Sequence, residues 1–201
     1  MSGGRSQARE RLRELPSVFS FRMATEAGVA KSTLYRLRDE GFIEVIGRGR
    51  FRIADTDLPV DLEFHEIAQR APQATICLVS ALSRHDLTDQ IPPAIDIAIP
   101  RGRRHPVTEA PVAWHSFDPG TFTVGRTELQ LDEKTAIGLY GPERSIIDAF
   151  RLRYLEGHEL AVEALKRWLR RPGTSPAALL AMARRFPKAR PALQNALEIL
   201  L

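Results

Sequence analysis

The chain has 201 residues, of which 43% are hydrophobic and 27% charged, and its formal net charge is +4. This composition is typical of a globular protein, and no apolar run approaches the roughly 18 residues that a membrane-spanning helix needs. The polar, basic N-terminus indicates no signal peptide, and a single cysteine, Cys77, excludes an intrachain disulfide framework. We therefore expect a cytoplasmic protein with no membrane partner and room for two domains.

The chain opens with a pattern of short helices. Residues 7–15 predict a helix that Pro16 ends. A second helix follows over residues 21–27, with small or apolar side chains at three-residue spacing on one face. Ser20 is suited to cap its N-terminus, because a serine hydroxyl can accept from a first-turn amide. Gly28 is suited to its end, where a left-handed residue is favoured.

Lys31–Glu40 predicts a further helix, which Gly41 ends. Leu34 and Leu37 fall on its inward face. The outward face carries hydrogen-bond donors: Lys31, Ser32, Thr33, Tyr35, Arg36 and Arg38. Such donors reach base edges and phosphates when a helix lies in the DNA major groove.

A β-hairpin is predicted next, with strands at residues 42–45 and 51–53 around a glycine-containing turn that projects arginines. Helix pair and hairpin together predict a winged helix-turn-helix. Residues 1–53 hold eleven Lys and Arg against six acids, so this quarter carries +5 and the remainder −1. A basic charge confined to one module favours nucleic-acid binding. The predicted DNA contacts are Arg22, Lys31, Ser32, Thr33, Tyr35, Arg36, Arg38, Arg48, Arg50 and Arg52.

The polar stretch Ala54–Pro59 is the best candidate for a linker between domains. It places a DNA-binding domain at residues 1–55 and a second domain at residues 56–201. The second domain is predicted to contain a mostly antiparallel or mixed sheet with flanking helices, so the fold class is α+β. Helices are expected over 61–70 and 75–85, strands over 95–99, 112–117, 121–124, 127–131 and 136–139, and helices from Pro142 onward.

Motifs for catalysis, metals and cofactors are not found: there is no phosphate-binding glycine loop, and the five histidines lack ligand spacing. We expect no cofactor, no metal and no catalytic residue. A basic loop with Arg101, Arg103 and Arg104 suits an acidic partner, a nucleotide or DNA backbone. Arg144 and Asp148, four apart on a helix, suit either a structural salt bridge or a contact with a partner or nucleotide.

Four stretches in fixed order resemble the AbiEi family of antitoxins, which are partners of nucleotidyltransferase toxins. They are FRMATEAGVAKSTLYRLRDEGFIEVIGRGRFRI, ICLVSALSRHDLT, IDIAIPRGRR and GPERSIIDAFRLRYLEG, and the similarity covers most of residues 16–169. The resemblance implies an N-terminal module that represses its own operon by binding double-stranded promoter repeats. It also implies a C-terminal domain that neutralises a cognate nucleotidyltransferase toxin. Candidate contacts with the toxin or a ligand are Arg101, Arg103, Arg104, Arg144 and Asp148.

Two other functions remain open at this point. In the first, the C-terminal domain inactivates the toxin enzymatically, as an atypical protein kinase, although no kinase fingerprint is found. Alternatively, the chain is a transcription factor whose C-terminal domain senses a small molecule.

Overall fold

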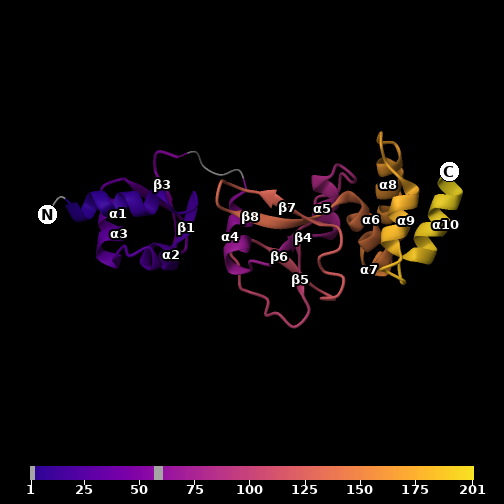
Figure 1. Cartoon of the computed structure of the whole chain (residues 1–201), viewed down its shortest axis with the longest axis horizontal. Coiled ribbons are helices and arrows are strands. Elements are labelled where there is room, and N and C mark those ends of the chain that lie inside the picture. The colour runs from indigo at the N-terminus through magenta and orange to yellow at the C-terminus, as the bar shows by residue number, and fades with distance from the viewer. Residues whose placement is uncertain (1–2, 57–60) are drawn as a thin grey trace. The chain divides into compact units, whose positions relative to one another are not determined.

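The computed structural model describes residues 3–56 and 61–201, and it confirms the α+β class. The contacts divide the chain into two compact units (Figure 1). The first unit comprises the residues up to Glu66 together with Gln130–Ala136, and the second comprises Ile67–Leu129 and Ile137–Leu201. No helix in the described part of the chain is long and apolar enough to cross a bilayer.

The first unit is a winged helix-turn-helix, as the sequence predicts. Its elements in chain order are α1 (Gly3–Arg13), β1 (Val18–Ser20), α2 (Phe21–Glu26), α3 (Lys31–Asp39), β2 (Ile43–Gly47) and β3 (Arg50–Ile53). The strands form an antiparallel sheet in the order β1-β3-β2. Strand β1 was not expected; it pairs Phe19 with Phe51, and the two rings stack with centroids 6.0 Å apart.

The predicted local signals shape the helix-turn-helix. The Ser20 hydroxyl accepts a hydrogen bond from the Met23 amide at 3.2 Å and so caps α2. Gly28 and Gly41 have φ of +78° and +73°, the left-handed conformation that glycine adopts without strain. Arg11 donates to the Gly28 carbonyl at 3.0 Å, which ties α1 to the turn between α2 and α3.

The second unit begins within α4 (Leu62–Arg70) and contains a five-stranded mixed sheet in the order β6-β5-β4-β8-β7. Strand β4 is antiparallel to β5 and parallel to β8, and β5 is parallel to β6. The strands are β4 (Thr75–Ile76), β5 (Ile95–Pro100), β6 (Val112–Phe117), β7 (Arg126–Gln130) and β8 (Ala136–Tyr140), with α5 (Leu78–Arg84) after β4.

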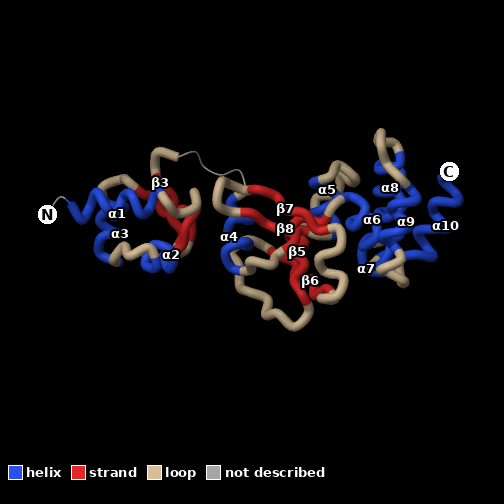
Figure 2. The backbone as a smooth tube through the Cα atoms, viewed as in Figure 1, coloured by secondary structure: helices blue, strands red, loops and turns tan. Residues whose placement is uncertain are grey.

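The C-terminal third is helical (Figure 2). Its helices are α6 (Pro142–Arg151), α7 (Arg153–Glu156), α8 (His158–Leu169), α9 (Pro176–Ala183) and α10 (Arg190–Leu200). Helix α6 is buried along most of its length, and it packs with α5, α8, α9 and α10 around a core that includes Phe150, Leu165, Trp168 and Leu193.

Three predictions of the sequence need correction. Residues 121–124 form turns instead of a strand. Residues 75–85 are not one helix, because the first two, β-branched and buried, form strand β4 between β5 and β8. The predicted boundary at 55/56 falls earlier than the division of contacts at Glu66, since Arg50 contacts Glu66 and His65 contacts Asp132. Part of the predicted linker, residues 57–59, lies outside the described residues.

Candidate nucleic-acid interface

Helix α3 separates apolar from polar side chains. Leu34 and Leu37 are buried in the core of the first unit. The predicted contacts that are exposed on α3 are all hydrogen-bond donors: Lys31, Ser32, Tyr35, Arg36 and Arg38. Thr33 is half-buried. The face presented to solvent can therefore donate to bases and phosphates over the length of the helix.

Helix α1 neutralises the acidic residue that ends α3. Arg9 Nη2 lies 2.9 Å from Glu40 Oε2, and Arg5 Nη1 lies 3.5 Å from Glu40 Oε1. Two cations distant from α3 in the sequence thus offset a carboxylate that would otherwise repel phosphate at that end of the helix. The positive charges on α3 itself are therefore offset less by this carboxylate.

The cations on α3 have different surroundings. The Arg38 guanidinium lies 4.8 Å from the Tyr35 ring centroid and its Nη2 lies 2.7 Å from Asp39 Oδ1, so its charge is partly neutralised. Lys31 Nζ lies 5.9 Å from the same ring centroid. Among the residues that the structure describes, Arg36 has no ion-pair partner. Arg36 is accordingly the best placed of these side chains for a base contact.

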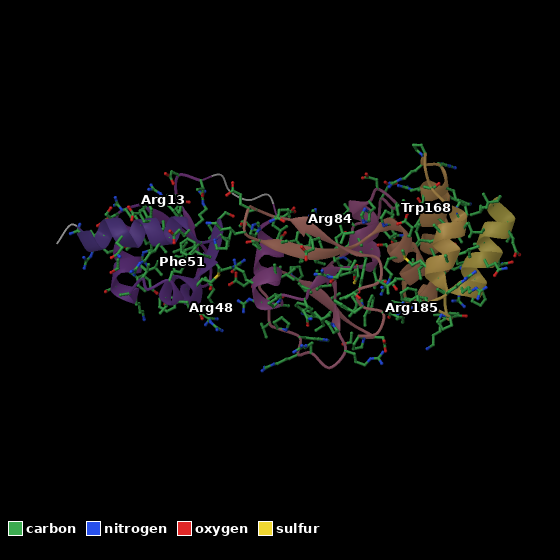
Figure 3. All side chains as sticks on the ribbon, viewed as in Figure 1. Arg13, Arg48, Phe51, Arg84, Trp168 and Arg185 are labelled. Atoms are coloured by element: carbon green, nitrogen blue, oxygen red, sulfur yellow. The ribbon has the colours of Figure 1, made fainter. Side chains whose placement is uncertain are left out.

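The hairpin β2–β3 places one arginine at its turn. Residues Arg48 and Gly49 connect the strands, and Gly49 has φ of +69°, which favours glycine at this position. The Arg48 side chain is exposed, whereas Phe51 in the adjoining strand is buried (Figure 3). The tip of the wing therefore presents a cation to solvent.

Arg50 does not project from the turn as the sequence predicts, and Arg52, also a predicted DNA contact, is held within the first unit. Arg52 lies opposite Glu44 in the sheet, and its Nη2 and Nε donate to Glu44 Oε2 at 2.6 and 3.0 Å. The Arg50 guanidinium lies beside Gly47, where a Cβ would be 2.6 Å from Nη2, and Nη1 is 3.6 Å from Glu66 Oε2. The side chains are only 12% and 14% exposed, so both predicted DNA contacts are corrected to internal contacts of the first unit.

Arg22 lies on α2 and is mostly exposed, with Nε 2.7 Å from Glu26 Oε1 one turn later. The hydrogen bond that Arg22 donates to Glu26 raises the pKa of the Arg22 guanidinium, so the side chain stays charged. An exposed pair of this kind contributes little to stability and leaves the arginine able to exchange its partner for a phosphate.

Arg144 and Asp148 are completely buried, which corrects their assignment as candidate contacts for a toxin or ligand. Arg144 Nε donates to Asp148 Oδ2 at 2.9 Å, and its Nη1 donates to the carbonyls of Thr121 and Val124 at 2.7 and 2.6 Å. Its guanidinium carbon lies 4.2 Å from the Tyr140 ring centroid. The structural salt bridge is the interpretation that this environment favours.

The buried pair also has an unusual electrostatic environment. Burial raises the pKa of the Asp148 carboxyl, although Arg144 and Arg151 both lower it, with Arg151 Nη2 3.0 Å from the second oxygen. Burial likewise raises the pKa of the Tyr140 hydroxyl, which donates to the Phe122 carbonyl at 2.8 Å. These groups connect α6, β8 and the turns after β6 inside the second unit.

A polar network that the sequence did not indicate links side chains of α5, β5 and β6. The buried Asp96 receives the His115 Nε2 on one oxygen at 2.9 Å, and its other oxygen lies 3.3 Å from the Ser80 hydroxyl. Serine and histidine thus contact different oxygens of the carboxylate instead of each other, which is not the arrangement of an activated nucleophile. The network satisfies a buried charge. Across the described residues, no group of three side chains is placed to hold a metal ion.

Arg101, Arg103 and Arg104 lie together on the exposed loop after β5, as the sequence predicts. Arg101 Nη1 is 4.0 Å from Asp118 Oδ2. Arg103 and Arg104 instead line a cavity with residues from the end of α4, which the sequence analysis had not associated with them. Of the contacts predicted in the second unit, these three arginines are the ones exposed at its surface.

Comparison with known proteins shows similarity of fold. No protein-family model matches the chain, and no curated protein matches it significantly in sequence. Among solved structures, the RV2827C protein from Mycobacterium tuberculosis superposes with a TM-score of 0.51 at 18% sequence identity. The similarity covers 96% of this chain and 80% of the mycobacterial chain, so it extends over both units.

Proposed function

We propose that this chain is a cytoplasmic DNA-binding repressor and antitoxin of the AbiEi type. Its winged helix-turn-helix binds repeats in the double-stranded promoter of its own operon. Its second unit neutralises a cognate nucleotidyltransferase toxin. The DNA-binding half of the proposal rests on the geometry of the first unit, and the antitoxin half rests on the family resemblance of the sequence.

The observation that carries the DNA-binding half is the exposed donor face of α3. Two buried leucines fix the helix against its core, and the opposite face presents Arg36 with no ion-pair partner in the described chain. In helix-turn-helix proteins the second helix enters the major groove, where an arginine can contact guanine through two hydrogen bonds. Arg48 on the wing is then suited to a phosphate or a narrow minor groove.

The antitoxin half draws on the ordered motifs SALSRHDLT, IPRGRR and PERSIIDAFR, all of which lie in the second unit. Because Arg144 and Asp148 of the third motif are buried, they act there as supports of the fold. The exposed arginines of the second motif are the polar groups still available to a partner.

Gel shifts on the native promoter test the DNA-binding half. We expect Arg36→Ala to weaken binding by about 1–3 kcal/mol, the range of a bidentate base contact. Arg48→Ala should weaken binding to every sequence alike and reduce the slope of log affinity against log salt by about one. Arg52→Ala, which removes a side chain paired with Glu44, should change affinity less than either. The matched control is Arg184→Ala, an exposed arginine of the second unit.

Unchanged affinity in both Arg36→Ala and Arg48→Ala would remove α3 and the wing from the interface. A loss of equal size in Arg184→Ala would indicate a general effect of positive charge instead of a defined surface.

The two halves can be separated in the full-length chain. The double variant Arg36→Ala with Arg38→Ala should lose promoter binding and still restore growth when the toxin is expressed from an unrelated promoter. If this variant fails to protect although it is folded and present at the normal level, neutralisation does not reside in the second unit alone.

A further inference from the structure

A cavity of about 320 Å³ in the second unit lies between the end of α4 and the end of β5. Its volume is at the lower end of the roughly 300–1,000 Å³ that small-molecule sites occupy. The residues that line it come from two short stretches of the chain: Arg70, Ala71, Pro72 and Gln73 from the first, and Ile99, Pro100, Arg103 and Arg104 from the second.

The charged residues that line this cavity are all cationic. Arg103 and Arg104 are exposed, and in the described ranges 3–56 and 61–201 neither side chain makes a hydrogen bond or an ion pair. Arg70, at the end of α4, also lines the cavity. The C-terminal end of α4 contributes a partial negative charge of about half a unit, which the two arginines of the loop outweigh. The cavity is therefore suited to an anion.

The loop after β5 directs its arginines to different places. Arg101 donates its backbone amide to the Phe117 carbonyl at 2.7 Å, and its side chain lies near Asp118. Gly102 follows with φ of +90°, and the Arg103 amide then donates to the Pro100 carbonyl at 3.1 Å. This hydrogen-bonded turn, anchored to β6, separates Arg101 from the two arginines that line the cavity.

The remaining lining is apolar apart from one amide. Ala71, Pro72, Ile99 and Pro100 supply surfaces against which a flat ring can pack, and the Gln73 amide can both donate and accept. An inorganic anion would use the guanidinium groups and leave these surfaces in water. A ligand with a phosphate group on an apolar, hydrogen-bonding ring would use both.

We propose that this cavity binds a mononucleotide. The guanidinium groups of Arg103 and Arg104 hold its phosphates, and the base packs on the prolines within reach of Gln73. This ligand is distinct from promoter DNA and from the toxin. The site would therefore let the second unit bind a small molecule, which the proposed function does not include.

Isothermal titration calorimetry on the full-length chain tests this site, with AMP, ADP, ATP, adenosine and inorganic phosphate as separate titrants. We expect at least one nucleotide to bind with one site per chain. Adenosine and phosphate alone should each bind at least about tenfold more weakly, because each uses only part of the lining. The double variant Arg103→Ala with Arg104→Ala should lose at least about tenfold in nucleotide affinity.

Arg101→Ala is the matched control, since it removes the same charge from the same loop at a residue that does not line the cavity. It should bind the nucleotide within about twofold of the unmodified chain, within the small effect expected of an exposed charge. Urea unfolding of each variant confirms that the chain is folded.

Three results would overturn the proposal. The first is no binding of any nucleotide. The second is inorganic phosphate binding as tightly as the best nucleotide, which would indicate a simple anion site. The third is an equal loss in Arg101→Ala and in the double variant, which would indicate a diffuse basic surface instead of a built cavity.

Discussion

Replacing Arg144 by alanine tests how the second unit is held together. The substitution leaves the Asp148 carboxylate completely buried with one of its two guanidinium partners removed, and it takes the donor from the Thr121 and Val124 carbonyls. Removing one partner of a buried ion pair costs about 3–5 kcal/mol. Arg151 remains 3.0 Å from the other carboxylate oxygen, so we expect a loss near 3 kcal/mol, the lower bound of that range.

Urea unfolding followed by tryptophan fluorescence measures this loss. Both tryptophans, Trp114 and Trp168, belong to the second unit, so the signal reports on that unit; Trp168 is labelled in Figure 3. With a slope of about 2 kcal/mol per molar urea, a loss of about 3 kcal/mol moves the midpoint by about 1.5 M. Arg101→Ala, an exposed control, should stay within about 0.5 kcal/mol.

The pH dependence gives a second readout. Without Arg144 the folded-state pKa of Asp148, already raised by burial, should rise further above its unfolded value. Between these two pKa values the folded variant binds more protons than the unfolded chain. Its stability therefore falls as the pH rises from the unfolded-state pKa to the folded-state pKa. The difference in unfolding free energy between Arg144→Ala and the unmodified chain should therefore become smaller as the pH is lowered.

A double variant separates the charge from the packing. Arg144→Met with Asp148→Leu removes both charges, and apolar replacement of a buried pair is often neutral or stabilising. It should regain part of the loss, although the two carbonyls stay without their donor. If Arg144→Ala shifted stability no more than Arg101→Ala, the pair would not be structural, and Arg144 would return as a candidate contact.

Further predictions concern single positions. Gly125→Ala should destabilise the second unit by at least about 1–3 kcal/mol in the same urea assay, because Gly125 has φ of +68° and a Cβ would lie 2.6 Å from the Cβ of Arg144. Ser20→Ala should cost about 1 kcal/mol in the first unit and speed amide hydrogen exchange in α2, since the cap is lost. The hydrogen bond from Arg167 lowers the pKa of the Asp89 carboxyl. An NMR titration should show this lowered pKa and its return towards the usual value in Arg167→Ala.

The local elements of the first unit could be predicted from the sequence because their signals are short in range. Helical spacing identified the buried faces of α2 and α3, and Ser20, Gly28 and Gly41 marked the ends of those helices. The wing was predicted from its glycines in the same way. Strand β1 was missed, since three residues are too few for a periodicity and its strand conformation depends on pairing with β3.

The surroundings of the charged residues were decided by tertiary structure. An arginine in a sequence carries the same charge whether it faces solvent or an acid, and its partner can come from any part of the chain. Glu66 lies beyond the hairpin that contains Arg50, and the carbonyls that Arg144 binds precede it by twenty residues or more. Two stretches of the chain, residues 70–73 and the set Ile99, Pro100, Arg103 and Arg104, form one cavity only because the fold places the end of β5 beside the end of α4. Sequence periodicity determined which faces are buried, and folding determined which cations remain available.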